Sequence, residues 1–161
     1  MSNLLIIYHS RTGGSRQMAQ AAYEAATPEH SVAMLPASEA NPDDVLWAKG
    51  VIFCCPENLA AISGAMKEFF DTCYYPLLGQ IEGKPYATMI CAGSDGENAA
   101  RQIARIATGW RMREVQPAII VNTNAQSPVA ILAEKTLTQQ QLAPCRELGQ
   151  AMGAGLSLGI F

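Results

Sequence analysis

Short, unbroken apolar runs recur along the chain and are separated by segments of helical periodicity. The runs occupy residues 4–8 (LLIIY), 31–35 (SVAML, the weakest), 51–55 (VIFCC), 87–92 (ATMICA) and 118–121 (AIIV). Most are rich in β-branched residues, and none alternates with polar positions, which is typical of strands buried on both faces of a parallel sheet. The pattern therefore predicts five strands covered by helices.

Helical patterns fill the intervals between the apolar runs. Apolar residues repeat at helical spacing within residues 18–25, 66–77 and 99–110. A last helix is expected within residues 136–153, where Pro144 should kink or restart it.

A short helix is also expected at residues 41–47. Asn41 can cap it, Pro42 suits its first turn, and the two aspartates that follow interact favourably with the helix dipole. Residues 123–135 form a long connection that can carry structure of its own.

The order of these elements predicts one domain, residues 1–161, without a linker, internal repeat or low-complexity tract. Strands that alternate with helices indicate an α/β fold with right-handed crossovers. We expect a doubly wound, five-stranded parallel sheet in the order 2-1-3-4-5, with helices on both faces. Such sheets bind ligands at the carboxyl ends of strands 1 and 3.

Composition argues against several classes of protein. The 161 residues are 16% charged, with a net charge of −3 and no Lys/Arg-rich run, so nucleic acid is not an expected partner. No apolar stretch approaches the roughly 20 residues of a membrane span. The N-terminus has no basic segment or cleavage site typical of secretion, so we expect a cytoplasmic protein.

The cysteines are interpreted as buried thiols. Their odd number and the absence of a CxxC pair argue against a disulfide framework and against a zinc site. Cys54 and Cys55 are neighbours on one strand, so their side chains should point to opposite faces of the sheet and not pair. The five are Cys54, Cys55, Cys73, Cys91 and Cys145.

The first strand is followed by a glycine pair with hydroxyl and guanidinium side chains around it. These residues are Ser10, Arg11, Thr12, Gly13, Gly14, Ser15 and Arg16. Glycines at a strand-to-helix turn let backbone N–H groups converge on an anion, helped by the helix dipole. The dinucleotide pattern GxGxxG and the GK[ST] of ATP and GTP sites are both absent. The turn is interpreted as a cradle for a terminal phosphate; the alternative is a tight turn without a ligand.

The loop after the third strand, PENLAAISG, mixes polar and apolar side chains. Glu57 and Asn58 are polar, whereas Leu59 and Ile62 are apolar, and Gly64 allows a close approach. Such a mixture suits a flat ligand with an apolar ring and polar edges, unless the apolar residues simply cover the core.

The loop after the fourth strand, AGSDGEN at residues 92–98, has two glycines whose neighbouring amides can contact a ligand edge. Asp95 or Asn98 can also cap the helix that follows.

Two of these loops carry a resemblance to a known family. Residues 10–15 (SRTGGS) resemble the flavodoxin phosphate loop. Residues 56–71 (PENLAAISGAMKEFFD) resemble the second flavin loop of NAD(P)H-dependent FMN reductases and flavodoxin-like quinone reductases. The resemblance implies a flavodoxin-like domain that binds FMN.

The same resemblance implies a place for each part of FMN. The phosphate would lie at Ser10, Arg11, Thr12, Gly13, Gly14 and Ser15. The isoalloxazine would be bordered by Pro56, Glu57, Asn58, Leu59, Ser63 and Gly64, and its other edge by Ala92, Gly93, Ser94, Asp95 and Gly96. Many short-chain flavodoxins place aromatic residues on the flavin faces, but residues 56–64 and 92–98 contain no Trp or Tyr. One flavin face is therefore expected to be open, which favours hydride exchange with a diffusing partner.

The resemblance favours an FMN-dependent oxidoreductase that passes hydride or electrons from NAD(P)H to a quinone or another small acceptor. The flavin carries that chemistry, so no catalytic side chain is required. One alternative is a flavodoxin-type electron carrier for a protein partner, for which a net charge of −3 is a weak fit. Another is a flavodoxin-like binding module without flavin. The apolar and aromatic surface of residues 64–78 predicts a homodimer or homotetramer.

Overall fold

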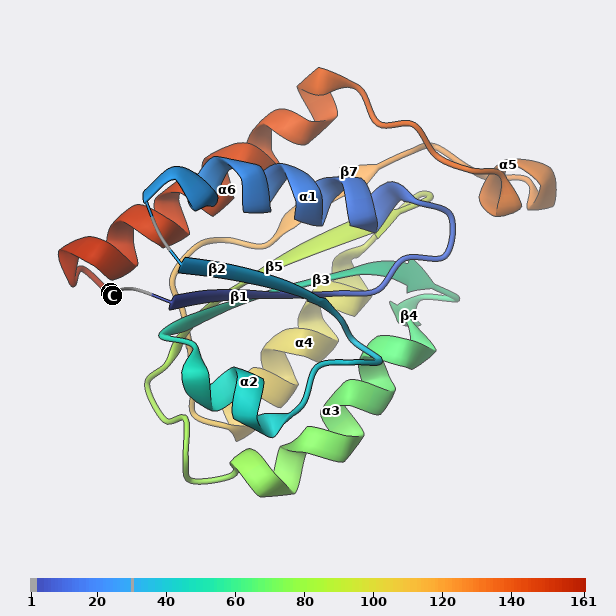
Figure 1. Cartoon of the computed structure of the whole chain (residues 1–161). Coiled ribbons are helices and arrows are strands. Elements are labelled where there is room, and N and C mark those ends of the chain that lie inside the picture. Colours follow the sequence, from blue (N-terminus) through green and yellow to red (C-terminus); the bar gives the residue numbers. More distant parts are fainter. Residues whose placement is uncertain (1–2, 30) are drawn as a thin grey trace.

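The structure, a computed structural model that describes residues 3–29 and 31–161, is a sheet covered by helices on both faces (Figure 1). Its elements are β1 (Asn3–Tyr8), α1 (Gly14–Ala26), the 3-10 helix η1 (Thr27–Glu29), β2 (Ser31–Pro36), α2 (Pro42–Trp47), β3 (Gly50–Asn58), β4 (Ala61–Ile62), α3 (Gly64–Leu77), β5 (Pro85–Ala92), α4 (Glu97–Gly109), β6 (Arg113–Glu114), β7 (Ile119–Asn122), α5 (Pro128–Leu132) and α6 (Gln139–Leu158).

The strand order confirms the predicted doubly wound topology. The strands run β2-β1-β3-β5, and β6 and β7 both pair with β5 in parallel, which places them together in the fifth position. The number of strands differs from the expected five because the last strand is divided, and Pro117 lies in the gap between its two pieces. A proline has no N–H to donate to the ladder, so continuous pairing fails there. The short strand β4 pairs antiparallel with β3 and is a further addition.

Two apolar clusters occupy the two faces of the sheet. One face packs against α1 and α6, and the other packs against α2, α3 and α4 (Figure 1). Cys54 belongs to the first cluster and Cys55 to the second, which confirms that these neighbouring side chains point to opposite faces. All five cysteines are free and buried.

The predicted start of α2 is confirmed, whereas α6 extends to Leu158, beyond the expected end at residue 153. The Asn41 side chain accepts hydrogen bonds from the amides of Asp43 and Asp44, and the Asp44 carboxylate accepts one from the Asn41 amide. The last helix begins at Gln139, and it continues through Pro144 instead of restarting there. Thr138 and Gln141 form a capping box at its start, which residue spacing alone did not locate.

Two further findings concern membrane-spanning helices and metal sites. None of the helices within residues 3–29 and 31–161 is long and apolar enough to cross a membrane. The same residues contain no group of histidine, cysteine and acidic side chains arranged to hold a metal ion. The cytoplasmic location and the single domain stay predictions.

Candidate functional site

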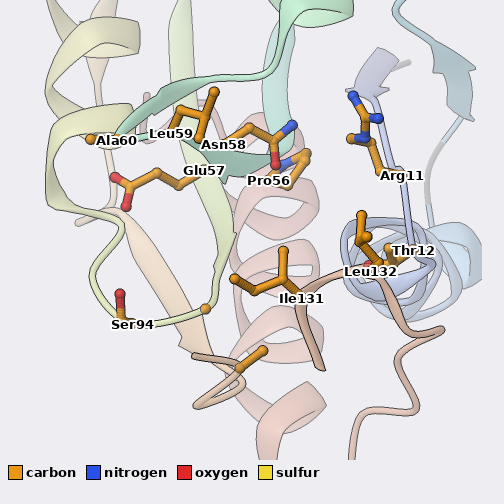
Figure 2. Close-up of a pocket in the computed structure, with 12 residues that line it drawn as sticks. Arg11, Thr12, Pro56, Glu57, Asn58, Leu59, Ala60, Ser94, Ile131 and Leu132 are labelled. Atoms are coloured by element: carbon orange, nitrogen blue, oxygen red, sulfur yellow. The ribbon is translucent and has the colours of Figure 1, made fainter. Parts of the chain in front are cut away.

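An open cavity of about 530 Å³ lies at the carboxyl ends of the central strands (Figure 2). Its walls come from the loops after β1, β5 and β7 and from the end of β3 with the turn that follows it. The lining residues are Arg11, Thr12, Pro56, Glu57, Asn58, Leu59, Ala60, Gly93, Ser94, Ala125, Ile131 and Leu132. All three loops expected at the ligand site therefore meet at one cavity. Among these described lining residues none is aromatic, and the uncovered ligand face stays a prediction.

The turn after β1 leads into a helix whose first amides have no side-chain cap. Gly13 adopts φ 95°, a left-handed conformation that glycine tolerates, and α1 begins at the next residue. The Ser10 hydroxyl accepts a hydrogen bond from the Gly13 amide over 3.0 Å, which holds the turn closed. Because no side chain caps α1, the positive end of its dipole is free to interact with an anion.

Ser15 is the most informative side chain of this turn. It is 1% exposed, and its hydroxyl has no hydrogen-bond partner among residues 3–29 and 31–161. A buried hydroxyl without a partner costs roughly 1–3 kcal/mol, so such groups usually have a partner. An anionic group at the start of α1 would supply one, which means that the residues present fit a phosphate.

Gly14 is required by close packing beneath the turn. A Cβ atom at this position would lie 2.5 Å from the Cys91 sulfur. The Cys54 thiol also lies 3.2 Å from the Ser15 carbonyl oxygen, to which it donates a hydrogen bond. The first turn of α1 therefore packs directly against β3 and β5.

The loop after β3 is a tight hairpin with a strained tip. Asn58 pairs with Ala61, and the two residues between them, Leu59 and Ala60, have φ values of 52° and 60°. Two-residue hairpins of this type usually contain glycine or asparagine, because other side chains are strained at positive φ. Two α4 side chains hold the hairpin in place: the Gln102 amide oxygen accepts from the Ile62 amide over 2.8 Å, and Asn98 donates to the Ala60 carbonyl. The Leu59 side chain is fully exposed at the tip.

Glu57 joins this hairpin to the loop after β5. Its two carboxylate oxygens accept hydrogen bonds from the amides of Gly96 and Ala99, over 2.9 and 3.2 Å. Glu57 therefore caps α4, a role that the sequence interpretation gave to Asp95 or Asn98. Asp95 also accepts from the amide of Glu97, the first residue of α4, over 3.3 Å, as expected from the sequence. Glu57 also lines the cavity, so the same side chain caps α4 and forms part of the cavity wall.

His9 and Ser63 connect the loops after β1 and β3. The His9 Nδ1 atom and the Ser63 hydroxyl oxygen are 2.8 Å apart and share a hydrogen bond. Burial, and secondarily the Arg11 guanidinium, lower the pKa of His9 below its usual 6.5, which favours the neutral imidazole. Gly64 starts α3, and apart from its chain neighbours and the nearby backbone of its own helix no described atom lies within 4 Å of the position that its Cβ would take.

The loop after β5 approaches the segment that follows β7. A Cβ on Gly93 would lie 2.7 Å from the Ala125 carbonyl oxygen, and Gly96 adopts φ 101° before α4. The Asn122 side chain donates to the Ser94 carbonyl over 2.6 Å. These contacts hold one edge of the cavity rigidly against β7.

The structure divides the predicted site residues into two groups. Lining the cavity are Arg11, Thr12, Pro56, Glu57, Asn58, Leu59, Gly93 and Ser94. Neighbouring positions in the same loops, outside the cavity lining, are Ser10, Gly13, Gly14, Ser15, Ser63, Gly64, Ala92, Asp95 and Gly96.

The wall formed by the segment after β7 was not predicted from the sequence. The α5 residues Ile131 and Leu132 face the cavity across from Pro56 and Asn58 (Figure 2), and Ala125 also lines it. Ser127 caps α5 by accepting from the Ala130 amide, and Pro128 occupies the first position. This serine–proline pair before an apolar stretch is the signal that could have located the helix.

Fold and site together define a class of protein: a doubly wound domain whose α1 turn suits an anion beside an open, mainly apolar cavity. The model of the family described as NADPH-dependent FMN reductase matches residues 25–126. The chain belongs to this family, which confirms the resemblance noted in the sequence. The match begins after the turn at residues 10–15 and ends before α5, so it does not cover those two parts of the site.

Individual relatives agree with this assignment. The chain is 36% identical over 98 residues to a flavodoxin of Aquifex aeolicus, which is 60% of this chain and 53% of that protein. It is 32% identical over 93 residues to an NAD(P)H dehydrogenase (quinone) of Acidithiobacillus ferrooxidans, covering 44% of this chain and 46% of the other. The chain thus spans about half the length of the curated relatives it matches.

Solved structures share the whole fold. A flavodoxin from the domain Archaea superimposes with a TM-score of 0.77 at 18% identity, covering 96% of this chain and 99% of that one. A WrbA-like flavodoxin from Agrobacterium tumefaciens gives a TM-score of 0.71 at 17% identity, covering 98% and 99%. At these identities the likeness shows the flavodoxin-like fold alone.

Proposed function

We propose that this chain binds FMN in the cavity and is an oxidoreductase that passes hydride or electrons from NAD(P)H to a small acceptor such as a quinone. The observation that carries the proposal is the buried, unpartnered Ser15 hydroxyl at the uncapped start of α1, next to an open cavity of about 530 Å³. This volume is within the range of pockets that bind small molecules and cofactors. The family assignment supports the same cofactor.

In this proposal the turn at residues 10–15 holds the phosphate. Hydroxyl groups of Thr12 and Ser15 and the first amides of α1 supply the hydrogen-bond donors. The Ser10 hydroxyl already accepts from the Gly13 amide, so its own hydrogen remains available for donation.

The ring would lie between the β3–β4 hairpin and α5. Pro56, Asn58 and Leu59 border it on one side, with Ser63 and Gly64 at the start of α3, and residues 92–96 form an edge. Ile131 and Leu132 add an apolar wall that excludes water from part of the cavity. The open space at the Gly64 Cβ position leaves room for a ligand to approach.

Bound FMN would supply two-electron and one-electron chemistry, so the side chains are needed for placement and not for acid–base steps. His9 agrees with this division, because burial favours its neutral form and its Nδ1 shares a hydrogen bond with Ser63. The exposed apolar residues Leu59, Ile131 and Leu132 at the cavity rim suit an apolar, planar acceptor.

A flavodoxin-type electron carrier is the second candidate, and the 36% identity with the Aquifex aeolicus flavodoxin favours it. The two functions differ in their response to a nucleotide donor. The FMN-loaded chain should lose its flavin absorbance within seconds when mixed anaerobically with NADPH or NADH, and a quinone should restore it.

Three outcomes separate the candidates. Bleaching and its reversal by quinone support the oxidoreductase. A flavin that is reduced by dithionite but not by either nucleotide over minutes supports the carrier. A chain that takes up no FMN supports a flavodoxin-like binding module without flavin. Free FMN mixed with NADPH is the control for uncatalysed reduction.

We also infer a homo-oligomer from an exposed apolar and aromatic surface around α2 and α3. Leu46, Trp47, Tyr75 and Leu78 are all more than a third exposed, and Tyr75 reaches 77%. Exposed apolar surface often marks contacts between subunits. Sedimentation of the FMN-loaded chain should give a dimer or tetramer, and a 17.2 kDa species alone would contradict the inference.

A further inference from the structure

Lys135 connects the turn after β1 with the α5 wall. Its backbone amide donates to the Thr12 carbonyl over 2.7 Å, and its own carbonyl accepts from the Gln17 side chain over 2.7 Å. Gln17 also donates to the Gly13 carbonyl over 2.9 Å. The main chain at Lys135 is therefore bonded to the same turn that was interpreted as a phosphate cradle.

The Lys135 ammonium is held in one place by backbone carbonyls. It lies 2.8 Å from the Ala130 oxygen, 3.0 Å from the Ile131 oxygen and 2.6 Å from the Ala133 oxygen. Carbonyls at a helix end carry partial negative charge and favour a cation. Since three donors are already satisfied by fixed acceptors, the charge is positioned before any ligand arrives.

The same ammonium faces Thr12, which lines the cavity. The Lys135 nitrogen is 3.5 Å from the Thr12 hydroxyl oxygen, at the outer limit of a hydrogen bond. A threonine hydroxyl beside a cation turns its lone pair toward the cation and its hydrogen away from it. That orientation makes Thr12 a donor toward an anion in the cradle.

The two arginines of the turn are in a different environment. Arg11 and Arg16 are exposed, so their charges are screened by water and salt, whereas Lys135 is half-buried. A fixed, partly desolvated charge interacts more strongly with an anion than a mobile exposed one does.

We propose that Lys135 is a specificity-determining residue that selects FMN over riboflavin, by placing a fixed positive charge behind Thr12 at the phosphate end of the site. This inference rests on the proposed function, in which the turn at residues 10–15 holds the phosphate. It adds a residue that lies outside that turn and outside the region matched by the family model.

The test compares the affinities for FMN and riboflavin, measured by quenching of flavin fluorescence, in the wild-type chain and in Lys135→Met. The substitution keeps the backbone contacts to Thr12 and Gln17 and removes the charge. FMN affinity should fall about tenfold, the value of one hydrogen bond, because the Thr12 hydroxyl loses the charge that orients it toward the phosphate. Riboflavin affinity should stay nearly constant, and Lys135→Arg should keep most of the preference for FMN.

A matched control exists at the other end of the sheet. The Lys84 ammonium donates to the Val45 and Ala48 carbonyls at the end of α2, over 2.6 and 2.5 Å, in the way that Lys135 caps α5. Lys84→Met should reduce stability without changing the ratio of FMN affinity to riboflavin affinity. If Lys135→Met fails to fold, Lys135→Gln provides a smaller, polar and uncharged replacement.

The outcomes distinguish this inference from the proposed function. An unchanged affinity ratio in Lys135→Met, or equal losses for both flavins, would overturn the role of Lys135 while leaving FMN binding intact. A ratio that changes as much in Lys84→Met would also overturn it, because the effect would then follow from stability alone. A wild-type chain that binds neither flavin would contradict the proposed function and this inference together.

Discussion

Replacing Ser15 by alanine should have opposite effects on stability and on FMN binding. The hydroxyl is buried and unpartnered among residues 3–29 and 31–161, so removing it relieves a desolvation cost of about 1–3 kcal/mol. We expect the free energy of unfolding of the flavin-free chain to rise by about 1–2 kcal/mol, allowing for partial relaxation of the site.

FMN affinity should fall in the same variant by about tenfold to a hundredfold, because one hydrogen bond to the phosphate is lost. Riboflavin affinity should not change. Urea denaturation of the flavin-free chain gives the first quantity, and fluorescence titration with each flavin gives the second.

Ser10→Ala is the matched control with the opposite sign for stability. The Ser10 hydroxyl accepts from the Gly13 amide over 3.0 Å, so its removal should destabilise the flavin-free chain. If Ser15→Ala instead destabilises the flavin-free chain, or weakens both flavins equally, then the hydroxyl is not held for a phosphate and the reasoning fails.

Four other predictions follow from contacts of the described residues. Glu57→Gln leaves only one good acceptor for the amides of Gly96 and Ala99, and it removes the negative charge at the start of α4. Urea denaturation should therefore show that the free energy of unfolding falls by about 1 kcal/mol. In Gly149→Ala the new Cβ would lie 2.2 Å from the Ala22 carbonyl oxygen, so stability should fall by about 1–3 kcal/mol, whereas the exposed Gln150→Ala should be nearly neutral. The pKa of His9 is lowered by folding, so its contribution to the free energy of unfolding is complete above pH 6.5 and is lost as the pH falls toward the folded pKa. Urea denaturation at a series of pH values should show that His9→Gln loses less stability on acidification than the wild-type chain does. Burial raises the pKa of four thiols to about 11 or 12 and that of Cys54 well above its usual range. A thiol reagent at neutral pH should therefore label the folded chain slowly and the urea-unfolded chain completely. Rapid labelling of the folded chain would show that the thiols are accessible.

Features that depend on local pattern could be predicted from the sequence. The apolar runs marked the central strands because a strand buried on both faces needs an apolar residue at every position. Asn41, Pro42 and Asp44 marked the start of α2 because capping involves residues that are close in sequence. The three ligand loops followed from the topology, since the carboxyl ends of parallel strands share one edge.

Features that depend on contacts between distant residues could not be predicted in this way. Glu57 caps a helix that begins 40 residues later, and only the folded sheet brings the two together. Leu59 and Ala60 have no turn propensity, and their positive φ values persist because Asn98 and Gln102 hold the hairpin.

Lys135 shows the same dependence on tertiary structure. It is separated from Thr12 by 123 positions and carries no motif, so its place beside the cradle became evident only when α5 was located.

The most direct measurement of the central claim is the visible absorbance spectrum of the purified chain after incubation with FMN and removal of free flavin by gel filtration. The proposed function predicts a yellow protein with the two flavin bands and about one FMN per chain, and no retained colour when Ser15 and Thr12 are both replaced by bulky apolar residues. A wild-type chain that leaves the column colourless would contradict it.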